Sequence, residues 1–196
     1  MTVLHTFVIL VDDRPGVLSR VASLFRRLNT NITSLTVGRS ETAGISRMTI
    51  VAAAPEDRAH RILASLYKLE EVREVDDVGR HSAVVRELAL LKVAAGVATR
   101  SDLFQLAEVF RARVVDLAPD SMMLELTGSA SKIEGLVQIL EESKYQILEM
   151  ARTGRMAMRR GHHTSRVLDA LSDATSEPGI AAVAAPGQDF LEEAIE

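Results

Sequence analysis

The chain has 196 residues, with 23 basic and 27 acidic side chains and a formal net charge of −4. This near balance excludes a general electrostatic attraction to nucleic acid or to an anionic membrane, and the absence of cysteine excludes disulfides and thiolate zinc sites. The sequence has no run of about 18 apolar residues and no charged segment of the kind that opens a signal peptide, so we expect a cytoplasmic protein without a membrane span.

Residues 3–79 predict four strands and two helices. The strands are short and rich in apolar and β-branched residues, and each helix carries apolar residues at helical spacing. In chain order we expect a strand at 4–11, a helix from Pro15 to Leu28, strands at 32–38 and 46–53, a helix opening at Pro55 and a strand at 72–78. We expect an aspartate before Pro15 to cap the first helix and Asn31 to form a left-handed turn after it.

The same element order returns in the second half. We expect a strand at 86–93, a helix beginning at Asp102, strands at 114–117 and 122–128, a helix beginning at Ser131 and a closing strand at 145–151. The repeated β-α-β-β-α-β order predicts an α+β protein with two consecutive ferredoxin-like domains, at residues 1–79 and 80–161. Residues 162–196, with their alanines, prolines and glycines, predict a flexible tail with short helices at 167–171 and 190–195.

The turn from Asp12 to Leu18 is the best candidate for a ligand site. A helix N-terminus attracts a carboxylate, Gly16 allows close approach to the backbone, and Asp12 or Asp13 can accept a hydrogen bond from an ammonium group. Asn31 and Ile32 could add an amide and an apolar wall. These groups suit a free aliphatic amino acid, but from turn chemistry alone a plain, well-capped helix start is the simpler explanation.

Motifs of catalysis are missing from the sequence. It contains no glycine-rich phosphate loop, no nucleophile elbow and no pair of carboxylates in an apolar setting that would separate their pKa values. We therefore expect a protein that is not an enzyme and holds no cofactor or metal of its own.

Several segments, in order, resemble one known family. The opening 11–21 is similar to the start of an ACT domain. Together with segments 31–38, 44–51, 86–93, 125–128, 151–154 and 159–161, it resembles the small, regulatory subunit of acetolactate synthase (acetohydroxyacid synthase). The likeness covers residues 3–161 and is more specific than any single motif.

The resemblance implies a partner and an effector. Small subunits of this family bind a large catalytic subunit that carries thiamine diphosphate, FAD and magnesium, and the pair catalyses the first committed step of branched-chain amino-acid synthesis. The small subunit activates the large one and confers feedback inhibition, usually by valine, with leucine and isoleucine as related effectors.

The resemblance also implies where the effector binds. ACT domains of this family pair side by side as a homodimer, with the effector between two copies. On this chain, the residues expected from one copy are Asp13, Gly16, Val17 and Leu18, and those from the other are Asn31 and Ile32. Many members have asparagine at the position of Asp13, which bears on affinity and selectivity.

Two other functions stay open at this point. A free-standing ACT-type amino-acid sensor could control another enzyme or a transcription factor, although such a sensor has no need of segments 86–93 and 152–161. A small ferredoxin-like enzyme is the third possibility, and it would require turnover by the isolated chain.

A few charged residues allow two interpretations. The basic cluster Arg152, Arg155, Arg159 and Arg160 is either a solvated face or a contact for the large subunit or an anion. Arg47 is either an exposed strand residue or the partner of a carboxylate on another subunit. His162 and His163 are more simply part of a solvated tail than metal ligands.

Overall fold

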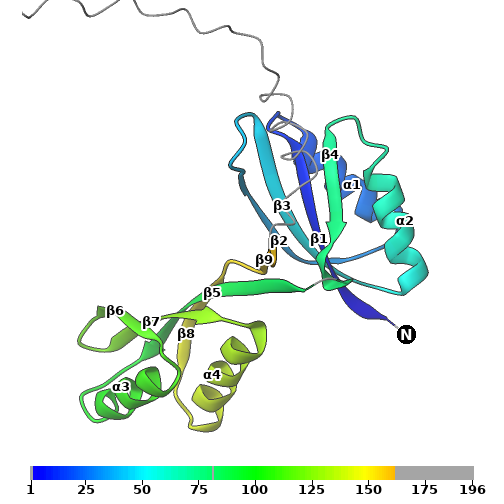
Figure 1. Ribbon diagram of the computed structural model, residues 1–196. Coiled ribbons are helices and arrows are strands. Elements are labelled where there is room, and N and C mark those ends of the chain that lie inside the picture. Colours follow the sequence, from blue (N-terminus) through cyan, green and yellow to red (C-terminus); the bar gives the residue numbers. More distant parts are fainter. Residues whose placement is uncertain (1, 81, 162–196) are drawn as a thin grey trace, which may run out of the picture.

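The computed structural model describes residues 2–80 and 82–161. The expected tail, its two short helices and the pair His162–His163 lie outside the described residues. Figure 1 shows two α+β domains, each a sheet with two helices on one face, joined through a long strand. No helix among the described residues is long and apolar enough to cross a membrane.

The first domain is an antiparallel four-stranded sheet in the order β2-β3-β1-β4. Its elements are β1 (Val3–Asp12), α1 (Val17–Arg27), β2 (Ile32–Arg39), β3 (Ile45–Ala54), α2 (Glu56–Leu66) and β4 (Val72–Asp77). The expected element order and ferredoxin-like fold are confirmed. The third strand alternates as expected, with Met48, Ile50 and Ala52 in the core under the helices.

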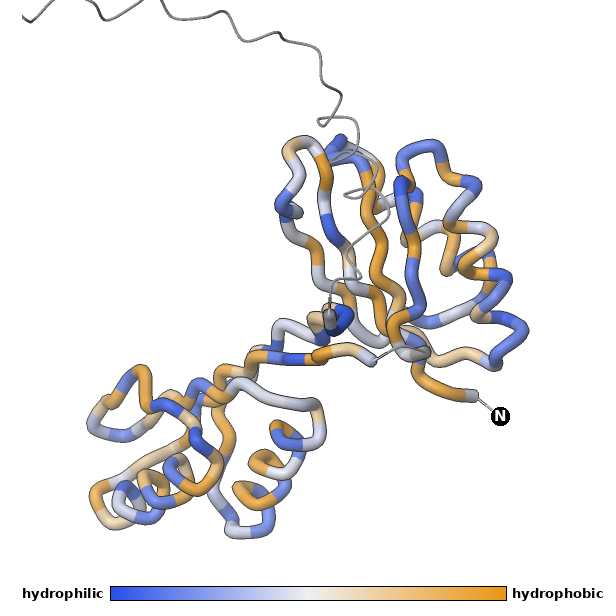
Figure 2. Tube along the Cα trace, in the orientation of Figure 1, coloured by the Kyte–Doolittle hydropathy of each residue, from blue (hydrophilic) through white to orange (hydrophobic). Residues whose placement is uncertain are grey.

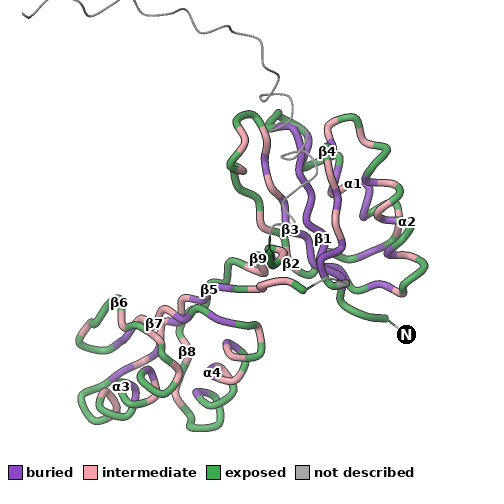
Figure 3. Tube along the Cα trace, in the orientation of Figure 1, coloured by how far each residue is buried: buried purple, intermediate pink, exposed green. Residues whose placement is uncertain are grey.

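The helices pack on the sheet through one apolar stripe each. In α1 the buried residues are Val17, Val21, Leu24 and Phe25, and the ring of Phe25 meets Phe7 of β1 edge-on. Figure 3 shows the result, with central strands β1 and β3 largely buried and β2 largely exposed at the edge. Figure 2 shows the matching apolar band along β1.

Both expectations about the ends of α1 are wrong. No side chain caps α1, and its N-cap is Gly16, at φ 88°; an aspartate cannot cap from position 12, because Asp12 is held in a two-point ion pair with Arg73. The left-handed residue after the helix is Asn29, at φ 49°, rather than Asn31. The chain therefore turns two residues earlier than we expected.

The second domain repeats the topology. Its elements are a 3₁₀ turn at Val78–Arg80, then β5 (Ala83–Ala94), α3 (Arg100–Val109), β6 (Arg113–Leu117), β7 (Ser121–Gly128), α4 (Ala130–Glu142) and β8 (Ile147–Arg152). The sheet order β6-β7-β5-β8 matches that of the first domain. Both helices begin earlier than expected: α3 at Arg100, and α4 at Ala130, because Ser129 accepts a hydrogen bond from the Lys132 amide as N-cap.

A strand that we did not expect, β9 (Met156–Arg159), connects the two domains. It pairs with the first residues of β5, from Ala83 to Arg86. Ala157 packs with Val8 and Val78 in a small apolar cluster on the face of the first sheet that α1 and α2 leave open. Arg47 of β3 donates a 2.8 Å hydrogen bond to the carbonyl oxygen of Ala157, so its side chain contacts this strand rather than solvent.

Candidate effector site and interdomain cleft

The start of α1 leaves an open, glycine-lined approach to the backbone. A Cβ built on Gly16 would meet nothing within 4 Å. The amide of Asp13 donates to the carbonyl oxygen of Gly44 at 2.8 Å, which fixes the turn, while the Asp13 side chain stays 48% exposed. A small anion could therefore reach the free N–H groups of the first helical turn, with a carboxylate beside it for an ammonium group.

Asp12 is not available to a ligand. Its carboxylate lies 2.6 and 2.8 Å from the guanidinium of Arg73, and this hydrogen bonding lowers the pKa of Asp12. Of the two aspartates that the sequence offered for an ammonium group, the structure leaves Asp13 exposed.

The two hydrophobic residues of the expected site at the start of α1 differ in exposure. Val17 is buried in the core, and its amide donates to the carbonyl oxygen of Arg14 at 3.5 Å, so its side chain is not available to a ligand. Leu18 is 43% exposed and presents its side chain to solvent. An aliphatic ligand at this end would therefore meet Leu18 and not Val17.

A single chain does not bring the whole expected site together. Asn31 and Ile32 stand at the start of β2, beyond the C-terminal end of α1, whereas Gly16 stands at its N-terminal end. The 11 residues of α1 separate these ends by about 16 Å at 1.5 Å per residue. Asn31 is exposed and Ile32 half-buried, so the two groups could meet only across two copies of the chain.

The outer edge of β2 is exposed and apolar. β2 ends its sheet, and Leu35 and Val37 are 36% and 43% exposed on the side that faces the helices. An eight-residue strand with free backbone groups on one side favours pairing with another strand. Leu35 and Val37 thus give this edge an apolar surface suited to a second copy.

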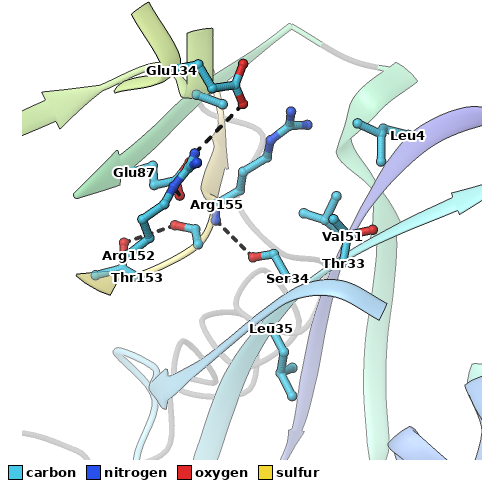
Figure 4. A pocket seen from close by; sticks show the side chains of 12 residues that line it. Leu4, Thr33, Ser34, Leu35, Val51, Glu87, Glu134, Arg152, Thr153 and Arg155 are labelled. Atoms are coloured by element: carbon cyan, nitrogen blue, oxygen red, sulfur yellow. Dashed lines mark hydrogen bonds and ion pairs between the residues drawn. The ribbon is translucent and has the colours of Figure 1, made fainter. Parts of the chain in front are cut away.

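A second hollow lies between the two domains (Figure 4). This interdomain cleft has a volume of about 390 Å³. One wall is the open face of the first sheet, including Leu4, Ser34 and Val51, and the other comes from the second domain, including Glu134 and the segment Arg152–Arg155. One feature of the sequence pointed to this cleft: the basic cluster near the last strand.

The structure separates the members of that basic cluster. Arg152 forms a two-point ion pair with Glu87, at 2.6 and 2.9 Å, and this hydrogen bonding raises the pKa of Arg152. Arg159 pairs with Asp76 of β4. Arg155 lines the cleft, and Arg160 is exposed.

Comparisons with known proteins match both domains. A family model described as the AHAS small subunit-like ACT domain matches residues 7–74, and one described as the small subunit of acetolactate synthase matches residues 86–161. A probable acetolactate synthase small subunit of Archaeoglobus fulgidus is 42% identical over 158 residues, covering 81% of this chain and 98% of that protein. The acetolactate synthase small subunit of Mycobacterium leprae is 43% identical, covering 80% and 92%.

A solved structure has the same architecture. The small subunit of acetolactate synthase from Thermotoga maritima is similar with a TM-score of 0.75 and 38% sequence identity, covering 82% of this chain and 99% of that one. The likeness extends over both domains of the chain, because its span exceeds either domain alone.

Proposed function

The chain belongs to the acetolactate synthase small-subunit family, and from this premise we propose that it is the regulatory subunit of that enzyme in branched-chain amino-acid biosynthesis. In this role it is not catalytic. It binds a large catalytic subunit, which carries the thiamine diphosphate, FAD and magnesium, and raises its activity in the cytoplasm. Valine, or leucine or isoleucine in its place, binds the small subunit and inhibits the activity of the assembled enzyme.

One observation carries the proposal. The open turn at Gly16, with the exposed carboxylate of Asp13, offers both charges that a zwitterionic amino acid needs. Leu18 beside it offers an apolar contact. We propose that residues 1–79 form the effector-binding and dimerising domain, and residues 80–161 the second domain of the regulatory subunit.

The apolar edge of β2 supports a homodimer that completes the site. If two copies pair through their β2 edges in antiparallel fashion, the α1 start of one copy faces the β2 start of the other. The ligand then lies between Gly16 of the first copy and Asn31 and Ile32 of the second. A ligand that contacts both copies stabilises the paired arrangement by the difference between its affinities for the paired and unpaired arrangements. If the two affinities were equal, the ligand would not change the activity.

The test is reconstitution with the catalytic subunit from the same source. Mixed and passed through a sizing column, the two proteins should elute together, and the small subunit should raise the rate of acetolactate formation from pyruvate several-fold. Valine added to the mixture should reverse that rise, and the small subunit alone should turn over no pyruvate. Failure to co-elute with any such synthase would instead favour a free-standing amino-acid sensor.

A further inference from the structure

Arg155 stands apart from the other partly buried arginines. Arg47, Arg58, Arg100 and Arg159 each donate from the guanidinium to a carbonyl or carboxylate oxygen. Among the arginines whose side chains the structure describes, Arg155 is the partly buried one whose guanidinium has neither a hydrogen bond nor an ion pair. A partly buried guanidinium without a partner in the chain favours a bound anion.

The position of Arg155 is fixed from its backbone. Its amide donates to the hydroxyl oxygen of Ser34 at 3.2 Å, which ties the residue to β2. In Figure 4 the guanidinium projects into the interdomain cleft between Glu134 and Leu4. The Ser34 hydroxyl accepts this bond and, within the described residues, donates to no other group, so its proton is free for a ligand.

The other charges around the cleft are already balanced, with one exception. Arg152 is neutralised by Glu87, whose side chain is only 5% exposed. Glu134 on α4 reaches Arg152 only at 4.0 Å and is itself 67% exposed. The cleft therefore presents one uncompensated cation, Arg155, and one loosely held carboxylate, Glu134, both on the wall that the second domain supplies.

Part of the first-domain wall is apolar. Leu4 of β1 and Val51 of β3 line the first-domain side of the cleft, and Figure 4 shows their side chains beside that of Arg155. A volume of about 390 Å³ lies in the range of small-molecule sites, which typically combine an apolar wall with a few fixed polar groups.

We propose that the interdomain cleft binds a small aliphatic carboxylate. Arg155 takes its carboxylate in a two-point contact, the Ser34 hydroxyl donates to it, and Leu4 and Val51 pack against its aliphatic part. This site goes beyond the proposed function, because it lies in one chain between its two domains and shares no residue with the expected effector site at Gly16 and Asn31. A ligand there would hold β2 against α4 and so fix the angle between the domains.

Two sources supply this chemistry: a free amino acid and its 2-oxo acid. An amino acid would add a contact between its ammonium group and Glu134, whereas a 2-oxo acid would be repelled by that carboxylate. L-valine and 2-oxoisovalerate differ at this one group and are the probes. Inorganic phosphate, an anion with no aliphatic part, is the third.

The experiment follows amide chemical shifts of the full chain during titration with each probe. We expect saturable shifts at Ser34, Gly154 and Arg155, and we expect Arg155→Gln to raise the dissociation constant for these shifts at least tenfold. Arg111→Gln is the matched control, because the side chain of Arg111 is exposed and has no partner among the described residues. Glu134→Gln should weaken valine alone if the ligand is an amino acid, and should spare or strengthen 2-oxoisovalerate if it is the oxo acid.

Three results would overturn the proposal: no shift at these amides with either organic probe, equal binding by the Arg155 and Arg111 variants, or phosphate binding as tightly as the organic acids. Each of them leaves the regulatory function standing, because that function is measured separately as valine inhibition of the reconstituted enzyme. If the reconstituted enzyme showed no valine inhibition while the amides of the cleft still shifted saturably with the probes, the regulatory proposal alone would be overturned.

Discussion

Thr36 donates a 2.8 Å hydrogen bond from its Oγ1 to the carbonyl oxygen of Thr153, joining β2 of the first domain to the segment that follows β8. The hydroxyl of Ser34, two residues earlier on β2, accepts from the amide of Arg155. β2 begins at the residues expected to hold the effector. A shift of β2 on effector binding would therefore reach the second domain directly, without crossing either core.

We predict that Gly154→Ala weakens this connection. Gly154 lies between the two bonded residues at φ 78°, and a Cβ there would collide with the Ser34 side chain. Gly44→Ala is the matched control, because Gly44 has φ 77° but open space around it. Both variants carry the cost of a left-handed alanine, about 1–2 kcal/mol, and the collision should add about 1–3 kcal/mol for Gly154→Ala.

Urea unfolding of the two variants at pH 7 measures this difference. If Gly154→Ala and Gly44→Ala lose the same free energy of unfolding, the contact between β2 and the segment after β8 does not form as described. The Gly154 variant should also activate the catalytic subunit less than the Gly44 variant does, provided that the connection transmits regulation.

A pH dependence follows from the ion pair between Asp12 and Arg73. Hydrogen bonding to Arg73 lowers the pKa of Asp12 in the folded chain, so the pair stabilises the fold above the unfolded pKa of about 3.9. This stabilisation is lost as the pH falls through the lower, folded pKa. Arg73→Gln should therefore unfold more easily than the parent chain at pH 7, and the two midpoints should approach each other as the pH falls below about 3.9 towards the lower, folded pKa of Asp12.

Arg61→Gln is the control for that pH series. Arg61 pairs with Asp57 at 3.8 Å on the surface of α2, where both side chains are at least 70% exposed, and such pairs add little stability. Its unfolding midpoint should follow the parent chain at every pH. A gap between Arg73→Gln and the parent chain that stays constant down to pH 2 would rule out the titration of Asp12 as its cause.

The exposed apolar edge of β2 predicts that the chain forms a dimer. Val37→Lys places a charge in the middle of the proposed β2–β2 contact, where it would be desolvated on pairing. We expect sedimentation equilibrium to show a dimer for the parent chain and at least a tenfold weaker dimer for Val37→Lys. Val97→Lys, at a residue 87% exposed elsewhere on the surface, should dimerise like the parent chain, and an unaffected Val37 variant would place the interface on another surface.

Much of this fold could be predicted because the apolar residues repeat with the period of each element. The stripe of Val17, Val21 and Leu24 predicts α1 before any contact is known, and the alternation around Ile50 predicts β3 with its buried face. Pairing order then follows from the two copies of the β-α-β-β-α-β pattern. These signals are local, and they agree with the tertiary packing.

The features that escaped prediction depend on contacts between distant residues. β9 has four residues, Met156–Arg159, and its one buried side chain is covered by Val8 of the other domain, so no local period marks it. From the local sequence, Asp12 is a plausible helix cap. In the structure its carboxylate instead forms an ion pair with Arg73, 61 residues away. The interdomain cleft likewise exists only because residue 155 lies against residue 34.

Substitutions at Gly16 test the proposed effector site. Gly16→Asp adds a carboxylate where the carboxylate of valine is proposed to sit, and we expect it to raise the valine concentration for half-inhibition of the reconstituted enzyme at least tenfold. Gly16 also has φ 88°, so any side chain there strains the backbone. Gly16→Ala carries that strain without the charge, and the open space around the position admits its methyl group.

The comparison between these two variants separates charge from conformation. If valine binds at the α1 start, Gly16→Ala should keep most of its inhibition while Gly16→Asp loses it, because only the aspartate competes for the free N–H groups of the first helical turn. Equal loss in both variants would mean that the left-handed turn itself is required, with the ligand contacts elsewhere. Full inhibition in Gly16→Asp would remove the α1 start from the effector site, because a carboxylate within reach of those N–H groups could not leave an anion site undisturbed.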